Sequence, residues 1–423
     1  MDQYAAPTQH PAVPDVAPAR WRVVIMCFLA LLLDGFDTTS ISFVVPTLAR
    51  EWGAAPAAFT LAFVTTSLGA VIGYLLSGRL AYRFGERQVI LGSVLLFACG
   101  SLVTCFVGSI SELAALRLVT GIGLGAVLPA AIATAANQFT ANRREVVAVA
   151  VAAGIGLGST LGGFFGGGLI ARHGWQAVFW LGGLLPLLLL PLMWWGLPAG
   201  ARQKAAEPNA RFEPGIRCLF TNSLAAGTML LWVYSFLIFL GLYALILWLP
   251  TLLLGYGFKP TETSIGTACI GVGGLVGVIL LIPLSWRFGG SRVLVFASLL
   301  AAAAVACLGL VGLERGQLLL TIAVIGMGLQ AGTVGQIALA VKLYPTALRT
   351  TGVGCAAAAG RIGSILGPAV GGMLLSLQMP PSQILLTACL PIAAAALAVG
   401  ILDFLGRRRQ CRSVAAGHTP SGD

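Results

Sequence analysis

The sequence predicts an all-α polytopic membrane protein with twelve transmembrane helices arranged as two six-helix halves. Of its 423 residues, 58% are hydrophobic and only 9% are charged, with a mean hydropathy of +0.93. Soluble domains carry about 25% charged residues, so this composition is that of a membrane protein. The apolar runs are about 20 residues long, which is the length of a membrane-spanning helix and not the short alternating pattern of a β-barrel strand.

Twelve apolar runs follow one another along the chain. They cover residues 21–45, 57–78, 88–107, 113–137, 146–170, 176–197, 224–254, 263–285, 292–312, 317–342, 350–376 and 383–405. The first six form an N-terminal bundle over 21–197, and the last six form a C-terminal bundle over 223–405. A cytoplasmic linker over 198–222 joins them, and residues 406–423 form a cytoplasmic tail. We expect residues 1–20 to be a disordered cytoplasmic tail, because they lack the apolar core of a signal peptide.

The distribution of Lys and Arg predicts the orientation of the chain in the membrane. With the N-terminus inside, 19 of the 25 basic residues fall on inner segments. The outer loops hold four basic residues, Arg50, Arg172, Lys259 and Arg315. Because cytoplasmic loops are enriched in Lys and Arg, we expect both termini on the cytoplasmic side of a bacterial inner membrane. The net charge of +11 is therefore a topology signal and does not indicate a nucleic-acid partner.

An internal repeat relates the two halves. Residues 78–89 (GRLAYRFGERQV) align with residues 282–293 (IPLSWRFGGSRV) at a shift of 204 and share an Arg-Phe-Gly core. At the same shift, four glycines of the fifth span (156, 163, 167 and 168) fall on four glycines of the eleventh (360, 367, 371 and 372). Parallel repeats are a recurring transporter architecture, with the substrate site between the halves near the middle of the membrane.

Two carboxylates lie inside the first span, in the segment DGFD at residues 34–37. A charged side chain at the bilayer centre costs roughly 2.5–3.5 kcal/mol on insertion scales, so such residues usually have a function. At positions i and i+3, Asp34 and Asp37 are expected on one helix face, looking into protein or a water-filled cavity. We predict that both carry protons; the alternative is that they are structural partners of arginine.

Arg361 is the best candidate for binding an anionic substrate. It lies well inside its span, and its planar fork of donors suits a carboxylate; the alternative is a structural ion pair. Arg117 is a second candidate, although it lies nearer the outer end of its span. Extension of the Arg117 side chain to the membrane surface, or anchoring of its helix, is the alternative there.

Uncharged side chains complete the candidate substrate site. Gln330 and Gln336 lie at membrane depth, where a cavity position competes with hydrogen bonding between helices. The seventh span holds five aromatic residues, Trp232, Tyr234, Phe236, Tyr243 and Trp248. Most are expected to face the core or lipid and one or two to stack on a substrate ring, with Trp232 and Tyr234 as the leading candidates. Glycines at i+4 spacing over 154–166 and 363–371 are expected to form packing seams along which helices slide.

Several segments resemble a known family. Residues 78–87, with Gly78, Arg83, Gly85 and Arg87, resemble the cytoplasmic loop signature of the major facilitator superfamily, and residues 117–125 (RLVTGIGLG) resemble its fourth-helix motif. Three further segments resemble the aromatic acid:proton symporters of that superfamily. They are DGFD at 34–37, WQAVFWLGG at 175–183 and the eleventh-helix region over 344–368. The resemblance covers residues 20–405.

This resemblance implies proton-coupled uptake of a small organic anion by alternating access, with an aromatic carboxylate such as a hydroxybenzoate as substrate. Gly78, Arg83, Gly85 and Arg87 would form the gating loop. The expected partners are the organic anion, protons and the lipid bilayer, with no nucleic acid, cofactor or metal, and the chain is expected to be a monomer. Carrying a monoanion inward against an inside-negative potential costs about 2.3 kcal/mol per 100 mV, which proton co-transport would offset.

Three positions depart from the family pattern. Tyr82 and Trp286 stand where the family usually has an aspartate that helps to latch the cytoplasmic gate, so we expect a weaker latch in both halves. Ala130 stands after Pro129, where the group commonly has an asparagine, and this change removes a polar group from the expected substrate site.

Other functions are compatible with the same sequence. An exporter of aromatic compounds by proton antiport is the nearest, followed by a symporter of a non-aromatic organic acid or sugar, and then by a sensor without transport. An enzyme is not expected, because the three histidines (His10, His173 and His418) lie outside the spans and no Walker sequence is present.

Overall fold

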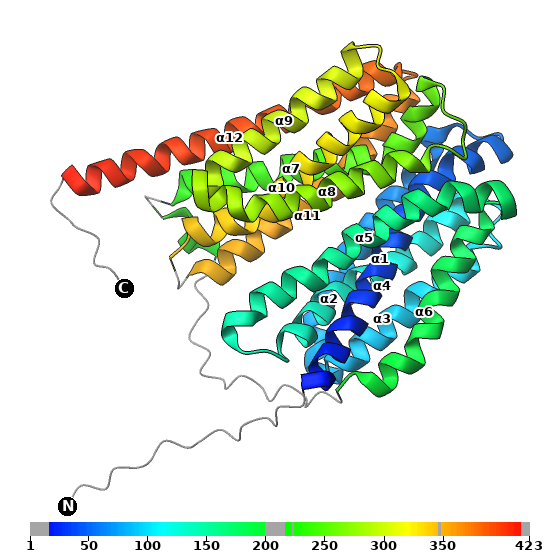
Figure 1. The fold of residues 1–423 in the computed structure, drawn as a ribbon, viewed down its shortest axis with the longest axis horizontal. Coiled ribbons are helices and arrows are strands. Elements are labelled where there is room, and N and C mark those ends of the chain that lie inside the picture. The colour runs from blue at the N-terminus through cyan, green and yellow to red at the C-terminus, as the bar shows by residue number, and fades with distance from the viewer. Residues whose placement is uncertain (1–16, 199–215, 222–223, 346–347, 416–423) are drawn as a thin grey trace, which may run out of the picture.

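A computed structural model describes residues 17–198, 216–221, 224–345 and 348–415, which are almost entirely helical (Figure 1). The N-terminal part contains α1 (Ala17–Glu51), η1 (Pro56–Phe59), α2 (Thr60–Phe84), α3 (Glu86–Thr104), α4 (Ile110–Ala136), α5 (Ala141–His173) and α6 (Gln176–Gly196). The C-terminal part contains η2 (Ile216–Phe220), α7 (Ala225–Leu253), η3 (Leu254–Tyr256), α8 (Ser264–Phe288), α9 (Gly290–Leu310), α10 (Arg315–Leu343), α11 (Arg349–Ser376) and α12 (Pro381–Ala415).

Twelve of these helices, α1 to α12, are long and apolar enough to span a membrane, and the described residues contain no strand. Each overlaps one predicted span, so the predicted fold class is confirmed. Several helices extend past the apolar run, because a helix can continue into water where its ends are polar. Residues 17–20 and 406–415, expected in the tails, therefore belong to α1 and α12. The rest of both tails and most of the predicted linker lie outside the described residues.

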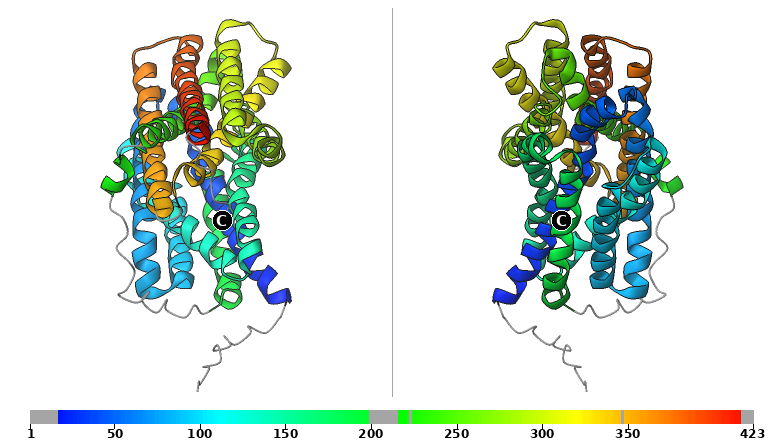
Figure 2. Two further views of the ribbon diagram at one scale, coloured as in Figure 1. Left: turned by 90° about the vertical axis from the view of Figure 1, so that its left-hand side faces the viewer. Right: turned by 90° about the vertical axis from the view of Figure 1, so that its right-hand side faces the viewer.

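The helices form two bundles of the same design. In the N-terminal half α1 packs on α5 and α2 packs on α4, and in the C-terminal half α7 packs on α11 and α8 packs on α10. Figure 2 views these two bundles from either end of the molecule, one above the other. The turns that join α2 to α3 and α8 to α9 both contain a glycine with positive φ, Gly85 at 92° and Gly289 at 87°. Only glycine adopts this backbone conformation without strain, so the repeated Arg-Phe-Gly core fixes the same turn twice.

Glycine seams lie within each half. Gly154 and Gly158 of α5 lie against the backbone of α1, and Gly363 and Gly367 of α11 lie against the backbone of α7. A side chain at any of these four positions would overlap the neighbouring helix. These glycines therefore form packing seams inside each bundle, as expected, and the sliding of helices along them stays a prediction.

The contacts between the two halves gather at one end of the molecule. There Gly163 of α5 lies against Ala268 of α8, the backbone N–H of Gly167 donates to Ser264 Oγ at 3.0 Å, and α11 packs on η1. The opposite end carries the turns with Arg83 and Arg287 and the last turn of α10 with Lys342, and we call it the basic end. In Figure 1 the halves lie together at the upper right and diverge toward the basic end at the lower left.

Candidate functional site

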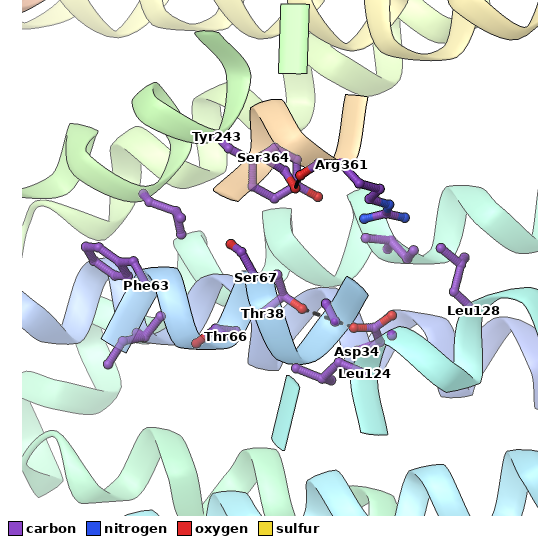
Figure 3. A pocket seen from close by; sticks show the side chains of 15 residues that line it. Asp34, Thr38, Phe63, Thr66, Ser67, Leu124, Leu128, Tyr243, Arg361 and Ser364 are labelled. Atoms are coloured by element: carbon purple, nitrogen blue, oxygen red, sulfur yellow. Dashed lines mark hydrogen bonds between the residues drawn. The ribbon is translucent and has the colours of Figure 1, made fainter. Parts of the chain in front are cut away.

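A cavity lies between the two halves, near the middle of the spanning helices. It is lined by α1, α2, α4 and α5 on one side and by α7 and α11 on the other, and it encloses about 760 Å³ of empty space, including the part open to solvent. Most of the lining is apolar, and the polar groups that matter below are Asp34, Thr38, Ser67, Tyr243, Arg361 and Ser364 (Figure 3).

Asp34 projects from α1 into this cavity. Its carboxylate accepts a hydrogen bond from the hydroxyl of Thr38, one turn later, at 3.0 Å, and the side chain is 5% exposed. Within the described residues Asp34 forms no ion pair within 4.0 Å. The structure therefore places this buried carboxylate at a cavity surface, where a ligand or water can reach it.

Arg361 projects from α11 on the other side of the same cavity, and Figure 3 shows its guanidinium opposite Asp34. The guanidinium carbon lies 5.2 Å from the ring centroid of Tyr74, which belongs to α2 of the other half. Such a cation–π contact is worth about 0.5–2 kcal/mol, less than a charge-assisted bidentate pair. The cavity thus presents a cation and a carboxylate from different halves, held by weak contacts.

Asp37 points away from the cavity, into the interior of the N-terminal half. It is fully buried, accepts a hydrogen bond from Ser101 of α3 and forms an ion pair with Arg117 of α4 at 3.2 Å. The guanidinium carbon of Arg117 also lies 4.9 Å from the ring centroid of Phe179 of α6. The expectation that the two aspartates share one environment is wrong: a step of three residues turns the helix enough to separate a cavity position from a bundle position.

Arg117 is therefore not placed for substrate binding. Its side chain is fully buried within one half and does not reach the membrane surface, which excludes the extended conformation considered from the sequence. Three contacts tie α1, α3, α4 and α6 together: the ion pair of Arg117 with Asp37, the hydrogen bond from Ser101 to Asp37, and the contact of Arg117 with the ring of Phe179. Removal of either partner would leave a buried charge uncompensated.

The four uncharged candidates do not line the cavity. Tyr234 is buried within the C-terminal half, where its hydroxyl donates to the carbonyl of Gly332 at 3.1 Å, and Trp232 packs edge-on against Phe220 of η2. Gln330 accepts a hydrogen bond from Thr333 at 3.2 Å, and Gln336 is 4% exposed in the interior. These side chains occupy helix faces that pack on neighbouring helices, and the sequence does not reveal which face that is.

Two further polar side chains of the cavity were not among the leading candidates. Ser67 of α2 and Tyr243 of α7 both line it, and neither hydroxyl forms a hydrogen bond with another described residue. Tyr243 is one of the five aromatic residues noted on the seventh span, about two and a half turns beyond Tyr234. The signal for Ser67 is weak, because serines in membrane helices usually hydrogen-bond to their own backbone.

The cavity is closed at the end where the two halves meet. Phe63 of α2 and Trp248 of α7 meet edge to face across the interface, with ring centroids 4.8 Å apart. Both rings are almost completely buried, and the indole N–H of Trp248 donates to the carbonyl of Pro368 at 2.9 Å. This aromatic pair separates the cavity from the end opposite the basic end.

The predicted gating loop lies at the basic end, away from the interface in this conformation. Gly78 has open space around it, Arg83 lies over the ring of Phe84, and Arg87 donates to the carbonyl of Trp194 in α6. Tyr82 and Trp286, which stand where an aspartate was expected, are 58% and 84% exposed.

A membrane protein with two repeated helix bundles and a charged cavity between them has the architecture of a secondary transporter. The sequence matches the Major Facilitator Superfamily over residues 27–313 and 256–415. The chain belongs to this superfamily, and its relatives there are transporters of aromatic acids.

Three relatives match nearly the whole chain. The gallate transporter of Pseudomonas putida is 34% identical, with 91% of this chain and 92% of the relative covered. The 4-hydroxybenzoate transporter PcaK of Pseudomonas aeruginosa is 32% identical, with 91% and 92% covered. The 3-(3-hydroxy-phenyl)propionate transporter of Escherichia coli is 33% identical, with 92% and 96% covered.

Solved structures agree with the fold. The nucleoside transporter NupG superposes with a TM-score of 0.75 at 14% identity, with 91% of this chain and 99% of that chain covered. The D-xylose-proton symporter superposes with a TM-score of 0.72 at 19% identity, with 90% and 97% covered. At this level of identity the likeness concerns the fold alone.

Proposed function

We propose that this protein takes up a small aromatic carboxylate together with protons by alternating access. The observation that carries the proposal is the cavity between the halves, with Arg361 on one wall and Asp34 on the other. The relatives named for gallate, 4-hydroxybenzoate and 3-(3-hydroxy-phenyl)propionate support an aromatic acid as substrate. The cavity belongs to one chain, so the transporter needs no second copy to complete its site.

Arg361 binds the substrate carboxylate in this proposal. Within the described residues its guanidinium forms no ion pair and lies over the ring of Tyr74, and a carboxylate would offer it two charge-assisted hydrogen bonds. The substrate ring then lies against apolar wall residues such as Ile41, Phe63 and Leu247. Hydroxyl substituents on the ring face Ser67 and Tyr243, whose hydroxyls are free to bond with them.

Asp34 carries the coupled proton. With Asp34 ionised and Arg361 charged, the empty cavity is neutral overall, and a bound carboxylate gives it one negative charge. Protonation of Asp34 makes the loaded cavity neutral again, which lowers the cost of burying it during the transport cycle. Substrate and proton therefore favour each other's binding, as a symporter requires.

Asp37 and Arg117 have a different role in this proposal. Because Asp37 is paired with Arg117 away from the cavity, we assign to this pair the positioning of α1 against α3 and α4. The pair would keep Asp34 aimed at Arg361 while the two halves move. This division of roles replaces the initial hypothesis that both aspartates carry protons.

We further propose that the basic end faces the cytoplasm of a bacterial inner membrane. The excess of Lys and Arg on that side supports this orientation. The aromatic pair of Phe63 and Trp248 then closes the outer side, and the halves diverge toward the cytoplasm. The conformation described here would be the one that releases substrate inward.

Purified protein in proteoliposomes tests the proposal. Labelled 4-hydroxybenzoate should accumulate when the outside is acidic, and unlabelled gallate should compete whereas a non-aromatic dicarboxylate should not. Substrate added outside should draw protons inward and make the external medium more alkaline. Acidification of the medium would instead indicate the exporter, and unchanged external pH with substrate entry would indicate transport without protons.

A further inference from the structure

A second cavity lies within the C-terminal half, at the basic end and outside the transport site. It is formed by α8, α9 and α10 and encloses about 530 Å³ of empty space, including the part open to solvent. Its polar lining consists of Ser285, Ser291 and Lys342 beside the first turn of α9, where Gly290 lies. No carboxylate lines it.

In the N-terminal half a carboxylate occupies the corresponding position. Glu86 is the first residue of α3, and its side chain accepts hydrogen bonds from Thr134 at 2.9 Å and from Asn137 at 3.4 Å, both on α4. A negative charge at a helix N-terminus interacts favourably with the helix dipole. Glu86 thereby links the start of α3 to the end of α4.

Packing contacts fix the correspondence between the two halves. The turns at Gly85 and Gly289 align α3 with α9 at a shift of 204, which places Gly290 in the position of Glu86. In α4, Gly121 lies against Thr66, and in α10, Gly326 lies against Ile270; Gly123 and Gly328 lie in the same way against Ser93 and Ala297. The pairs Gly121 with Gly326 and Gly123 with Gly328 therefore align α4 with α10 at a shift of 205 residues.

Leu339 and Lys342 therefore take the positions of Thr134 and Asn137, and both line the second cavity. The C-terminal half thus keeps the helix start, has Gly290 in place of the carboxylate, and has an ammonium group where the N-terminal half has an amide. A Cβ atom added at Gly290 would meet only Ser285 Oγ, at 3.9 Å.

The cavity also contains an unused donor. Ser291 is 4% exposed and lines the cavity, and its hydroxyl has no hydrogen bond to another described residue. The start of α9 likewise has no side-chain cap. The free N–H groups of a helix start, a buried hydroxyl and a lysine together form a binding site for an anion.

We propose that this second cavity binds the phosphate group of a molecule other than the transported substrate. The bound phosphate takes the place that Glu86 fills in the N-terminal half and links α9 to α10. A phospholipid headgroup and free phosphate both carry this chemistry. The basic end is expected at the membrane surface, where headgroups lie within reach of Lys342.

The test uses the melting temperature of the purified full-length protein, because a ligand that binds the folded state raises it. Wild-type protein in detergent is compared with and without added phosphatidylglycerol, and separately with inorganic phosphate or chloride. Gly290→Glu restores the carboxylate of the other half, Lys342→Gln removes the charge, and Arg79→Gln removes an exposed charge at the basic end of the N-terminal half as a control.

We expect phosphatidylglycerol or phosphate to raise the wild-type melting temperature. Gly290→Glu should raise the melting temperature without added anion and abolish the further increase that the anion causes. Lys342→Gln should reduce the increase caused by the anion, and Arg79→Gln should retain it. An increment with phosphatidylglycerol alone identifies a headgroup site, and an increment with inorganic phosphate identifies a site for the free anion. If neither raises the wild-type value, or if Lys342→Gln and Arg79→Gln retain the same increment, the proposal is wrong. Lys342 is exposed, so this comparison survives if Gly290→Glu does not fold.

Discussion

The two halves treat their internal charges differently. In the N-terminal half, Arg117 pairs with Asp37 and Glu86 bonds to α4, so that these charged groups meet partners from the same bundle. In the C-terminal half, Arg361 faces the central cavity and Lys342 lines the second one, and neither forms an ion pair within the described residues. Both halves share the same helix packing and the same glycine turn.

This difference indicates how the same bundle serves two roles, linking helices through paired charges in the N-terminal half and offering cations to anions in the C-terminal half. The paired charges link helices within the N-terminal bundle, and one carboxylate, Asp34, lies at the cavity surface. Cations without carboxylate partners in the C-terminal bundle are available to anions from outside. The variants below should separate these roles, beginning with the largest expected effect.

Asp34→Asn should abolish accumulation of substrate driven by a proton gradient, because an amide cannot take up the coupled proton. Exchange of labelled for unlabelled substrate without a gradient should continue, since Arg361 is intact. Uptake and exchange in proteoliposomes distinguish the two steps. Accumulation at the wild-type rate with unchanged pH dependence would exclude Asp34 as the proton carrier.

Arg117→Ala should destabilise the protein by about 3–5 kcal/mol, because the buried carboxylate of Asp37 loses its partner. Arg361→Ala is the matched comparison in the other half and should have little effect on stability, since it removes a contact with the ring of Tyr74 and breaks no ion pair among the described residues. Thermal unfolding in detergent measures both. Equal stability of the two variants would contradict the contrast between a charge that is paired within its bundle and a charge that faces the cavity without an ion pair.

Arg361→Ala should weaken binding of an aromatic carboxylate by roughly 10- to 150-fold, the equivalent of about 1.5–3 kcal/mol for charge-assisted hydrogen bonds. Arg361→Lys keeps the charge without the planar fork and should lie between wild type and the alanine variant. Titration calorimetry with 4-hydroxybenzoate gives these affinities. Arg315→Ala, at the end opposite the basic end, serves as a control for general loss of charge, and unchanged affinity in Arg361→Ala would remove Arg361 from the site.

Ser67→Ala should reduce affinity for a hydroxylated substrate by about 0.5–1.5 kcal/mol, the net value of one neutral hydrogen bond. Benzoate has no ring hydroxyl, so its affinity should stay constant in the same variant. Competition assays with both acids in one preparation provide the comparison. A parallel loss for benzoate would assign Ser67 to the carboxylate end of the substrate instead.

The candidate site was partly predictable from the sequence. Asp34 and Arg361 stand out because an ionisable group inside an apolar span is costly, and both line the cavity. The same rule selected Asp37 and Arg117, which the fold uses to satisfy each other. The free-energy cost of placing a charged side chain in the membrane therefore identifies functional and structural charges together and does not separate them.

The sequence by itself determined the class of fold, the twelve spans and the repeat, because the hydrocarbon core requires long apolar helices and a glycine turn leaves a recognisable pattern. Tertiary structure alone decided which helix faces meet. It placed Asp34 at the central cavity and Asp37 beside Arg117, buried Tyr234, and placed Ser67 and Tyr243 in the cavity lining. It also left Gly290 beside an open cavity where the other half holds Glu86. In lipid, an interior face and an outer face are both apolar, so the sequence pattern along a helix does not encode its rotation.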